Sequence, residues 1–535
     1  MRVTNNMILR NSSYNINGTK GIVNNSMNQM TTQKKINKPS DDPVVAIRSL
    51  RLSTSLSRVE QYYKKNIPDA ESWLDVTETA LTNIKSLMTD IRTQCVNGAT
   101  DTLTQDDRHT ILSQLKALQE QIFAEGNADY AGRTVFTGFR TDQDLVFTES
   151  EKDTAYNINQ SFSYEKLEAF RYYTGNVEVP TTQAGVLGNA ISDTRETDYY
   201  RLVTAYKDVG EIKELSYTYP IADGTQKVIC EKQADGSISQ MVHKYDTDGN
   251  EVGTPTESGK LLIYENEDEW AAANASKLKE VADEDMVFIK STGQLIMGNT
   301  VASDIRTNHA SIDINYDKKG FSKGELKPEY YFNCTDNTNP AHPVTYEKFD
   351  ADGNEIGYDI NYTVSMNQEL TVNLEASDAF NSDILRDVDD LVSAVDQSIR
   401  AHEKIDSIKK MMGEAQYAGE EYQAKLKEWL TAAQKEADYA DDHMQKLYSR
   451  EIGKVDEYLG NVNLAITKVG CTVDQLKLTE TRMSNQQETI MELQSENDDL
   501  DVSEIIINYT AAYNAYQSSL TAAGKLSGMT LLNYI

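Results

Sequence analysis

The chain has 535 residues, of which 39% are hydrophobic, and its length suits about three or four domains. Its net charge of −32 argues against nucleic-acid binding, because phosphate contacts need basic patches. The mean hydropathy is −0.57, and no apolar run approaches the roughly 18 residues that span a bilayer. We therefore expect a soluble chain, and its N-terminus lacks the apolar core of a cleaved signal peptide.

The charge is unevenly distributed. Residues 1–40 contain six basic residues and no Asp or Glu, and the last 31 residues carry only Lys525 as a charged side chain. All 84 acidic residues therefore lie between the two ends. A solvated helix usually carries mixed charges, so polar, uncharged ends indicate faces that meet other protein.

The N-terminal segment is predicted to be a helix. Its spacing alternates between three and four residues, which is the heptad period. The positions are Leu9, Ser12, Ile16, Thr19, Val23, Ser26 and Met30. The segment is rich in Asn, Ser, Thr and Gly, which are poor helix formers. We expect it to order fully only against a partner.

A break follows this helix, at Pro39, Ser40, Asp41, Asp42 and Pro43. Either Asp41 or Asp42 can cap a new helix that has Pro43 in its first turn. That helix is expected to run to Pro68, and a second one carries the apolar stripe from Trp73 to Ile91. A third is expected from Ile111 to Ile122.

The sequence pattern changes in the central region. Short alternating runs, glycine-containing turns and many tyrosines predict one or two β-rich domains over residues 136–375. Residues 244–253 (KYDTDGNEVG) and 348–357 (KFDADGNEIG) form an internal repeat. Each copy is predicted to be a β-hairpin with Asp-Gly in the turn.

Helices are expected to resume near residue 378. Residues 400–450 are rich in Ala, Glu, Lys and Asp, which is typical of an exposed helical hairpin. Heptad positions Leu476, Met483 and Ile490 follow. The C-terminal stripe then consists of Ile506, Tyr509, Tyr513, Tyr516, Leu520 and Ala523.

The predicted fold is a mostly α-helical coiled-coil bundle formed by both termini, with a central β-rich insertion. Residues 1–40 with 505–535 are the terminal helices, and 41–135 with 376–504 form a helical bundle that includes the hairpin near 400–450. Residues 136–375 are the outer β-rich part. The candidate assembly interface consists of Leu9, Ile16, Val23, Met30, Ile506, Tyr509, Tyr513, Tyr516 and Leu520.

Catalytic, cofactor and metal sites are not predicted. The six histidines are scattered, the four cysteines lie far apart, and neither a phosphate loop nor a Gly-x-Ser-x-Gly elbow is present. The two Asp-x-Asp-Gly turns resemble calcium loops, but their Gly stands at position 4 rather than 6. We therefore favour a structural protein that is not an enzyme, and leave calcium at these turns open.

The terminal motifs resemble the bacterial flagellin superfamily. The residues that carry the resemblance are the N-terminal helix with Pro39 to Pro43, residues 127–138 (NADYAGRTVFTG), and the C-terminal helices ending in LLNYI. Flagellin itself usually has an Asp-Asp-Ala-Ala-Gly type sequence at the first position, so the Pro-Ser-Asp-Asp-Pro motif favours the members that join hook and filament. The resemblance covers about residues 1–140 and 360–535.

The resemblance implies a flagellin-like fold and a secreted, homo-oligomeric ring at the hook-filament junction. It also implies type III export without cleavage. Its expected partners are the hook-proximal junction protein, flagellin and an export chaperone on the C-terminal segment. Two alternatives stay open: a divergent flagellin, and an exported coiled-coil adhesin whose central domain binds a ligand.

Overall fold

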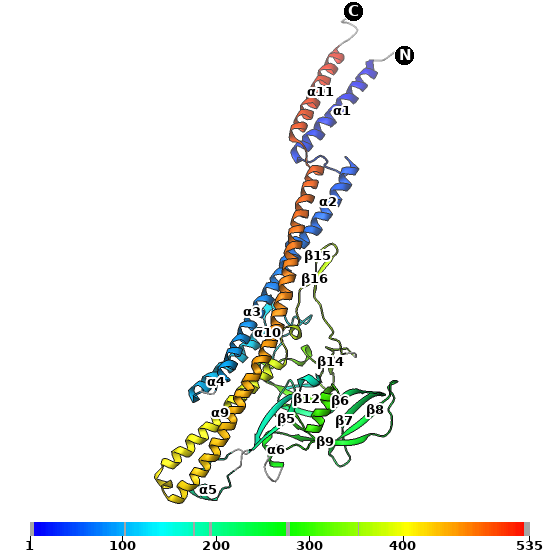
Figure 1. The fold of residues 1–535 in the computed structure, drawn as a ribbon. Helices are drawn as coiled ribbons and strands as arrows, with labels where there is room; N and C mark the ends of the chain where they lie inside the picture. Colours follow the sequence, from blue (N-terminus) through cyan, green and yellow to red (C-terminus); the bar gives the residue numbers. More distant parts are fainter. Residues whose placement is uncertain are drawn as a thin grey trace, which may run out of the picture. The chain divides into compact units, whose positions relative to one another are not determined.

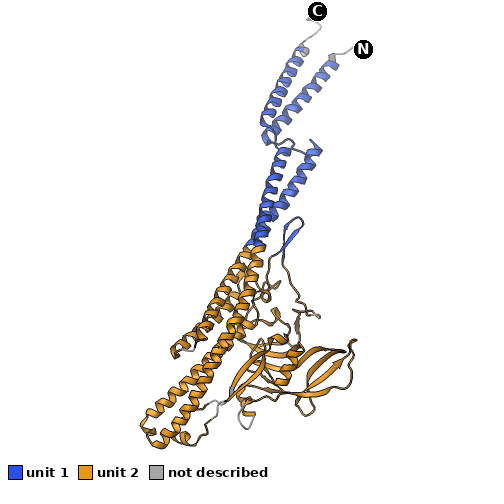
Figure 2. Ribbon diagram, in the orientation of Figure 1, with its two compact units in different colours: residues 1–71, 361–371, 472–535 blue, residues 72–360, 372–471 orange. Residues whose placement is uncertain are grey.

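The computed structural model describes residues 5–100, 103–174, 177–191, 195–273, 279–350 and 353–528. The chain divides into two units, coloured separately in Figure 2. Unit 1 comprises residues 1–71, 361–371 and 472–535, and unit 2 comprises residues 72–360 and 372–471. As predicted, the chain is helical at both ends with a β-sheet region between them (Figure 1).

Unit 1 consists of helices and one β-hairpin. Its elements are α1 (Asn5–Thr32), α2 (Pro43–Gln61), the π-helical turn η1 (Tyr62–Asn66), the start of α3 (Ile67–Gly98), β15 (Asn361–Ser365), β16 (Gln368–Thr371), the last part of α10 (Glu420–Asp498), and α11 (Val502–Gly528). Helices α1 and α11 pack side by side (Figure 1). The expected C-terminal residues 531–535 lie outside the described part of the chain.

The expected break at Pro68 is wrong. Helix α2 passes through η1 directly into α3, so Pro68 lies inside the first turn of a helix instead of ending one. Proline lacks an amide hydrogen and its ring clashes with the carbonyl four residues earlier. In η1 the Ile67 amide bonds to Tyr62 five residues back, and this wider turn precedes the proline without ending the helical path.

The helices of unit 2 form an antiparallel framework. The chain passes from α3 to α4 (Gln105–Gly126), and later from α9 (Asp383–Gly413) through a turn into the first part of α10. Thr104 caps α4 through a reciprocal capping box with Asp107. The hairpin expected near 400–450 is the α9–α10 turn. It is less exposed than the composition indicated, because residues from 177–191 pack on Trp429 and its neighbours.

The central region forms one large sheet, which contains twelve strands in the described residues. Their spatial order is β14-β13-β3-β12-β6-β7-β8-β9-β10-β11-β5-β4, and every neighbouring pair is antiparallel except β9 with β10. The longer strands are β3 (Glu151–Ser163), β4 (Glu168–Thr174), β5 (Arg195–Val203), β6 (Val209–Ile221), β7 (Gly224–Lys232), β8 (Ile238–Tyr245), β9 (Thr256–Tyr264) and β12 (Ser311–Phe321). The shorter ones are β10 (Met286–Ile289), β11 (Gln294–Met297), β13 (Asn333–Asp336) and β14 (Val344–Tyr346).

Short elements complete unit 2. They are β1 (Asp129–Tyr130), β2 (Arg133–Thr134), α5 (Gln183–Gly188), α6 (Glu267–Ala273), α7 (Asn299–Thr307), α8 (Ala376–Ala379) and the 3₁₀ turns η2 (Tyr164–Lys166), η3 (Pro328–Tyr330) and η4 (Ala415–Tyr417). Strands β10 and β11 are buried throughout, and Trp270 of α6 packs into an aromatic and aliphatic cluster on them. This burial explains why their sequences are apolar on successive residues rather than alternating, apart from the buried Gln294, which accepts a hydrogen bond from Tyr172 at 2.7 Å.

Candidate assembly interface

The inner faces of α1 and α11 follow the predicted heptad period. On α1 the less exposed residues include Ser12, Ile16, Thr19, Val23 and Ser26, all of which the sequence placed on one stripe. On α11 the corresponding residues are Ile505, Tyr509, Ala512, Tyr516, Ser519 and Ala523. Because the two helices pack on each other, these positions form the seam within the pair.

The remaining predicted residues point outward. Leu9 is 40% exposed, Met30 37%, Ile506 49%, Tyr513 41% and Leu520 45%. The predicted C-terminal stripe therefore splits: Tyr509, Tyr516 and Ala523 are half-buried, while Ile506, Tyr513 and Leu520 are exposed. The pair also exposes apolar side chains that the sequence reading did not select, namely Met7, Tyr14, Ile22, Met27 and Ile507.

The break between α1 and α2 is an ordered joint. Gln33 ends α1 in a left-handed conformation with φ of 57°. Asp42 is the cap of α2: its carboxylate accepts the amides of Val44 at 2.9 Å and Val45 at 3.2 Å, and Pro43 begins the helix as predicted. Asp41 instead holds the preceding loop, because it accepts the amide of Lys38 at 2.9 Å.

A second joint, between α10 and α11, lies against the first. The Lys35 amide donates to the Asp498 carbonyl at 2.8 Å, and the Leu500 amide donates to the Gln33 carbonyl at 3.1 Å. Lys34 forms an ion pair with Asp499, and this contact lowers the pKa of the Asp499 carboxyl. Main-chain bonds between the two joints fix where both terminal helices leave the rest of unit 1.

Side-chain hydrogen bonds near the two joints also connect α2 with the end of α10. Ser49 of α2 donates to Asp498 at 2.8 Å, and the buried Asn497 donates to the Val45 carbonyl at 3.1 Å. Asp501 caps α11 as Asp42 caps α2, since it accepts the Ser503 amide at 2.8 Å. The sequence reading missed this second joint, although the acidic run from Asp498 to Asp501 before an uncharged helix was a usable signal.

The β15–β16 hairpin is a further part of unit 1 that the sequence reading did not place. Asn66 of η1 donates to the Thr363 carbonyl at 2.7 Å. Gln368 donates to Thr479 of α10 at 3.2 Å, and Arg482 donates to Ser365 at 3.3 Å. The hairpin therefore bonds to both helical segments of unit 1 beside the π turn.

The first copy of the internal repeat forms the predicted hairpin, and the described residues of the second copy are joined in the same way by an isolated antiparallel bridge between Phe349 and Glu355. In the first copy the Asp246 carboxylate accepts the Asn250 amide at 2.8 Å, and Gly249 has φ of 82°. In the second copy Asp350 accepts Asn354 at 2.8 Å, and Gly353 also has φ of 82°. The first aspartate thus acts as a turn cap. Within the described ranges no cluster of three or more His, Cys, Asp or Glu side chains has the arrangement of a metal site.

The terminal pair offers packing surface rather than chemistry. From Ile505 to Lys525, α11 carries one charged side chain, Lys525, and it exposes aromatic and aliphatic side chains. In the described part of the chain, no helix is long and apolar enough to cross a membrane. An uncharged, partly apolar helix surface is suited to contacts with other helices.

The N-terminal part of the chain is similar to known flagellar proteins. Residues 3–141 match the family model of the bacterial flagellin N-terminal helical region. Flagellar hook-associated protein 3 of Salmonella typhimurium is 25% identical over 143 residues, which is 26% of this chain and 45% of that protein. Its counterpart in Escherichia coli is 28% identical over 115 residues, which is 21% of this chain and 36% of that protein. The match thus spans less than half of each relative.

Two solved structures share a distant likeness. A flagellar hook-associated protein from Vibrio parahaemolyticus has 12% identity and a TM-score of 0.34, with 86% of this chain and 100% of that chain covered. The flagellar junction protein from Legionella pneumophila has 10% identity and a TM-score of 0.27, with 85% and 100% covered.

Proposed function

From the resemblance of the N-terminal region to flagellar hook-associated protein 3, we propose that this chain is a structural subunit of the hook-filament junction. It joins hook and filament by self-assembly of its terminal helices, and it has no catalytic role. After type III export it forms a homo-oligomeric ring in the secreted flagellum, between the hook-proximal junction protein and flagellin.

The observation that carries this proposal is the outward apolar surface of the α1–α11 pair. Exposed apolar side chains such as Leu9, Met30, Ile506, Tyr513 and Leu520 lie on helices with very few charges. Contiguous apolar surface on a single chain usually marks a contact with another protein. Here it supports coiled-coil packing between neighbouring subunits.

The composition of the termini supports export and assembly as separate stages. Helix α1 is rich in Asn, Ser, Thr and Gly, so its intrinsic helix propensity is low. A weakly stable helix unfolds at little cost for passage through a narrow channel and becomes ordered when it packs. Before export, a chaperone bound to the C-terminal segment would cover its apolar face.

The experiment is a charge substitution on the outward face. In Tyr513→Asp a carboxylate replaces a 41% exposed aromatic ring, so its burial against a neighbouring helix becomes costly. The matched control is Leu478→Asp, which places the same charge at a 75% exposed leucine on α10. Polymerisation is followed by sedimentation and electron microscopy of the purified full-length chain with its axial partners.

We expect Tyr513→Asp to abolish assembly while its circular dichroism stays unchanged. Leu478→Asp should assemble like the wild type. Normal assembly of Tyr513→Asp would refute the outward face as the interface.

A divergent flagellin is the second candidate, because the matching family model describes the N-terminal region of flagellin in general. Copy number separates the two functions. A subunit of one ring is expected in far fewer copies per flagellum than a filament subunit, which is expected in thousands. Quantitative mass spectrometry of isolated flagella that found the higher number would favour the filament subunit.

A further inference from the structure

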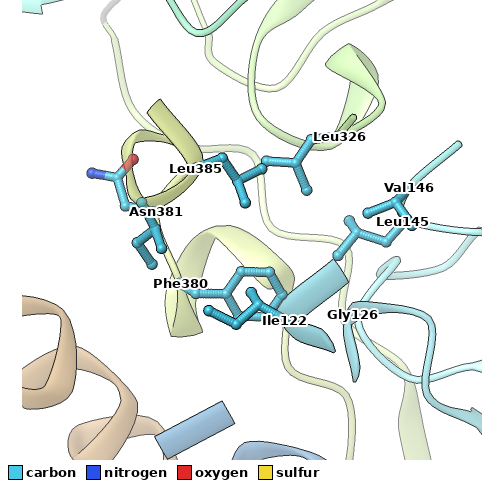
Figure 3. Close-up of a pocket in the computed structure, with 9 residues that line it drawn as sticks. Ile122, Gly126, Leu145, Val146, Leu326, Phe380, Asn381 and Leu385 are labelled. Carbon is cyan, nitrogen blue, oxygen red and sulfur yellow. The ribbon is translucent and has the colours of Figure 1, made fainter. Parts of the chain in front are cut away.

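The small pocket of unit 2 drawn in Figure 3 has no room for a ligand. Its walls include Ile122 of α4, Leu145 and Phe380, and its volume is about 10 Å³. A space of that size is at the lower limit for a single water molecule. The features that indicate a further role lie instead on the surface of unit 1.

Helix α2 has an outward face that is apolar near its start and basic further along. Val44 is 67% exposed, Ile47 53% and Leu50 66%. Arg51 and Arg58 are exposed as well. From Val44 through Ile47 and Arg51 to Arg58 the steps are three, four and seven residues, so these side chains share one side of the helix. We call these five residues the basic face.

The arginines of α2 lack acidic partners within the chain. The helix also carries Arg48, and it has no Asp or Glu before Glu60. None of Arg48, Arg51 and Arg58 forms an ion pair with another residue that the structure describes. The exposed side of a solvated helix usually mixes both signs of charge. Arginines of one sign beside exposed apolar side chains therefore indicate a surface for an acidic partner.

The last part of α10 carries the opposite charge. Glu488, Glu492 and Glu496 are exposed and spaced by four residues, and Met491 beside them is 52% exposed. We call these four residues the acidic face. Like charges four residues apart destabilise a helix, and no Lys or Arg follows Arg482 on α10 to offset them. Over the described ranges, none of the three glutamates forms an ion pair.

Contacts within unit 1 set the register of these two helices. Asn497 of α10 donates to the Val45 carbonyl of α2 at 3.1 Å. Further along, Gln487 donates to Glu60 at 3.1 Å. The sequence number rises along α2 while it falls along α10, so the two segments are antiparallel.

The register places the two faces at the same level of unit 1. Counting from those contacts, Arg58 is level with Glu488, and Arg51 is level with the stretch from Glu492 to Glu496. At the rise of an α-helix, Arg51 and Arg58 are about 10 Å apart along α2, and Glu488 and Glu496 about 12 Å apart along α10. The two sets of charges therefore match in spacing and height, although they form no ion pair within the chain.

Faces that match but do not meet within one chain can meet between two copies placed side by side. Such a contact joins two different surfaces of the same chain, and it closes into a ring when the rotation between neighbours returns to the first copy. Resting on the ring of the proposed function, we propose that the basic face of α2 binds the acidic face of α10 on a second copy at the same height. Arg51 and Arg58 pair there with the glutamates.

The test reverses the charge of one face at a time in the full-length chain. Arg51→Glu with Arg58→Glu makes both faces acidic, and Glu488→Arg with Glu492→Arg makes both faces largely basic. Like charges then meet at each contact, so we expect the concentration for half-maximal self-association to rise at least about tenfold for either variant alone. Sedimentation velocity measures this concentration.

Mixing the two variants is the decisive measurement. In an equimolar mixture the acidic variant meets the basic one with opposite charges, so association should return to the wild-type level. A contact within one chain could not be rescued in this way. If both variants are folded by circular dichroism and the mixture still fails to associate, a second copy is not the partner of the basic face.

A control and a salt series separate this contact from net charge. Arg400→Glu with Lys409→Glu on α9 makes the same change of charge at side chains that are 70% and 58% exposed, and it should associate like the wild type. An equal loss in this control would refute the specific contact. Wild-type association should also weaken between about 0.05 M and about 0.5 M salt, because exposed ion pairs are screened.

The remaining outcomes also decide. Unchanged association of the folded Arg51→Glu, Arg58→Glu variant would refute the proposal. If the charge reversals do not fold, the milder Arg51→Gln with Arg58→Gln and the salt series take their place, and no change in either would refute it.

This contact and the terminal face of the proposed function fail separately. Association lost in the Arg51→Glu, Arg58→Glu variant but kept in Tyr513→Asp would leave the α2 contact and refute the terminal face. The reverse pattern would refute the α2 contact alone. So would a wild-type chain that does not associate with itself at about 0.05 M salt, because the terminal face is tested with the axial partners present.

Discussion

At the residue scale, the pKa of Glu451 in unit 2 is set by electrostatic effects that oppose one another. Glu451 is 1% exposed on α10, and its Oε2 has no hydrogen-bond partner among the residues that the structure describes. Burial and the nearby negative charge of Asp387 on α9 raise its pKa to about 7, against the opposing effect of Lys454 and Arg450 on its own helix. Glu168 of β4, the Cys95 thiol of α3 and Tyr458 of α10 also interact with it electrostatically.

A raised pKa has a definite consequence for stability. The folded chain retains a proton on Glu451 at pH values where the unfolded chain has lost it, so this residue destabilises the fold as pH rises from about 4.5 to 7. We expect Glu451→Gln to be more stable than the wild type at pH 8, by on the order of 1–3 kcal/mol, with little difference near pH 4.5. Urea denaturation at both pH values measures this; a pH-independent difference would contradict it.

Asp42 acts locally at the start of α2. Replacing a capping aspartate with alanine typically costs about 1 kcal/mol, because helix amides lose their acceptor. We expect Asp42→Ala to speed hydrogen exchange in the first turn of α2, whereas the exposed neighbour Ser40→Ala should not. Equal exchange in the two variants would mean that the main-chain bonds between the two joints hold the turn without the cap.

At the scale of elements, α1 and α11 bury little apolar surface against each other. Their seam contains serine, threonine and alanine among few large apolar residues, and many of the large ones face outward. Little apolar area is therefore buried within the pair, and helix stability in proteins comes mainly from such burial.

We accordingly expect the amides of α1 and α11 to exchange much faster than those of α9 in a dilute monomer, and to become protected on assembly. Mass spectrometry of deuterium uptake before and after polymerisation tests this. Strong protection of both helices in the monomer would show that the seam alone suffices, and would count against ordering by a partner.

At the scale of the whole molecule, the two units offer separate readouts. The three tryptophans of the chain, Trp73, Trp270 and Trp429, all belong to unit 2 and are buried. Their fluorescence therefore reports the folding of that unit. We expect deletion of residues 1–32 to abolish assembly without moving the fluorescence midpoint of thermal unfolding by more than about 2 °C. A large shift would mean that unit 2 depends on the terminal helix for its stability.

The local features were readable from the residues because they depend on near neighbours. Heptad spacing predicted the seam of α1, Asp42 and Pro43 predicted the start of α2, and Asp-Gly predicted the hairpins of the repeat. The misplaced break at Pro68 has the same origin: proline ends most helices, but the π turn before it depends on the surrounding structure. The three-part division at residues 40, 135 and 375 stays a prediction, and it differs from the two units.

By itself the sequence determined the acid-free helical ends, the position of the first joint and the β-rich centre, since periodicity, proline and charge act over a few residues. Only the tertiary structure decided which stripe residues face inward, as Tyr509 does, and which face outward, as Tyr513 does. It also decided that Lys34 and Lys35 meet Asp498 and Asp499. Such pairings join residues hundreds of positions apart, and their selection depends on the packing of whole elements rather than on any local pattern.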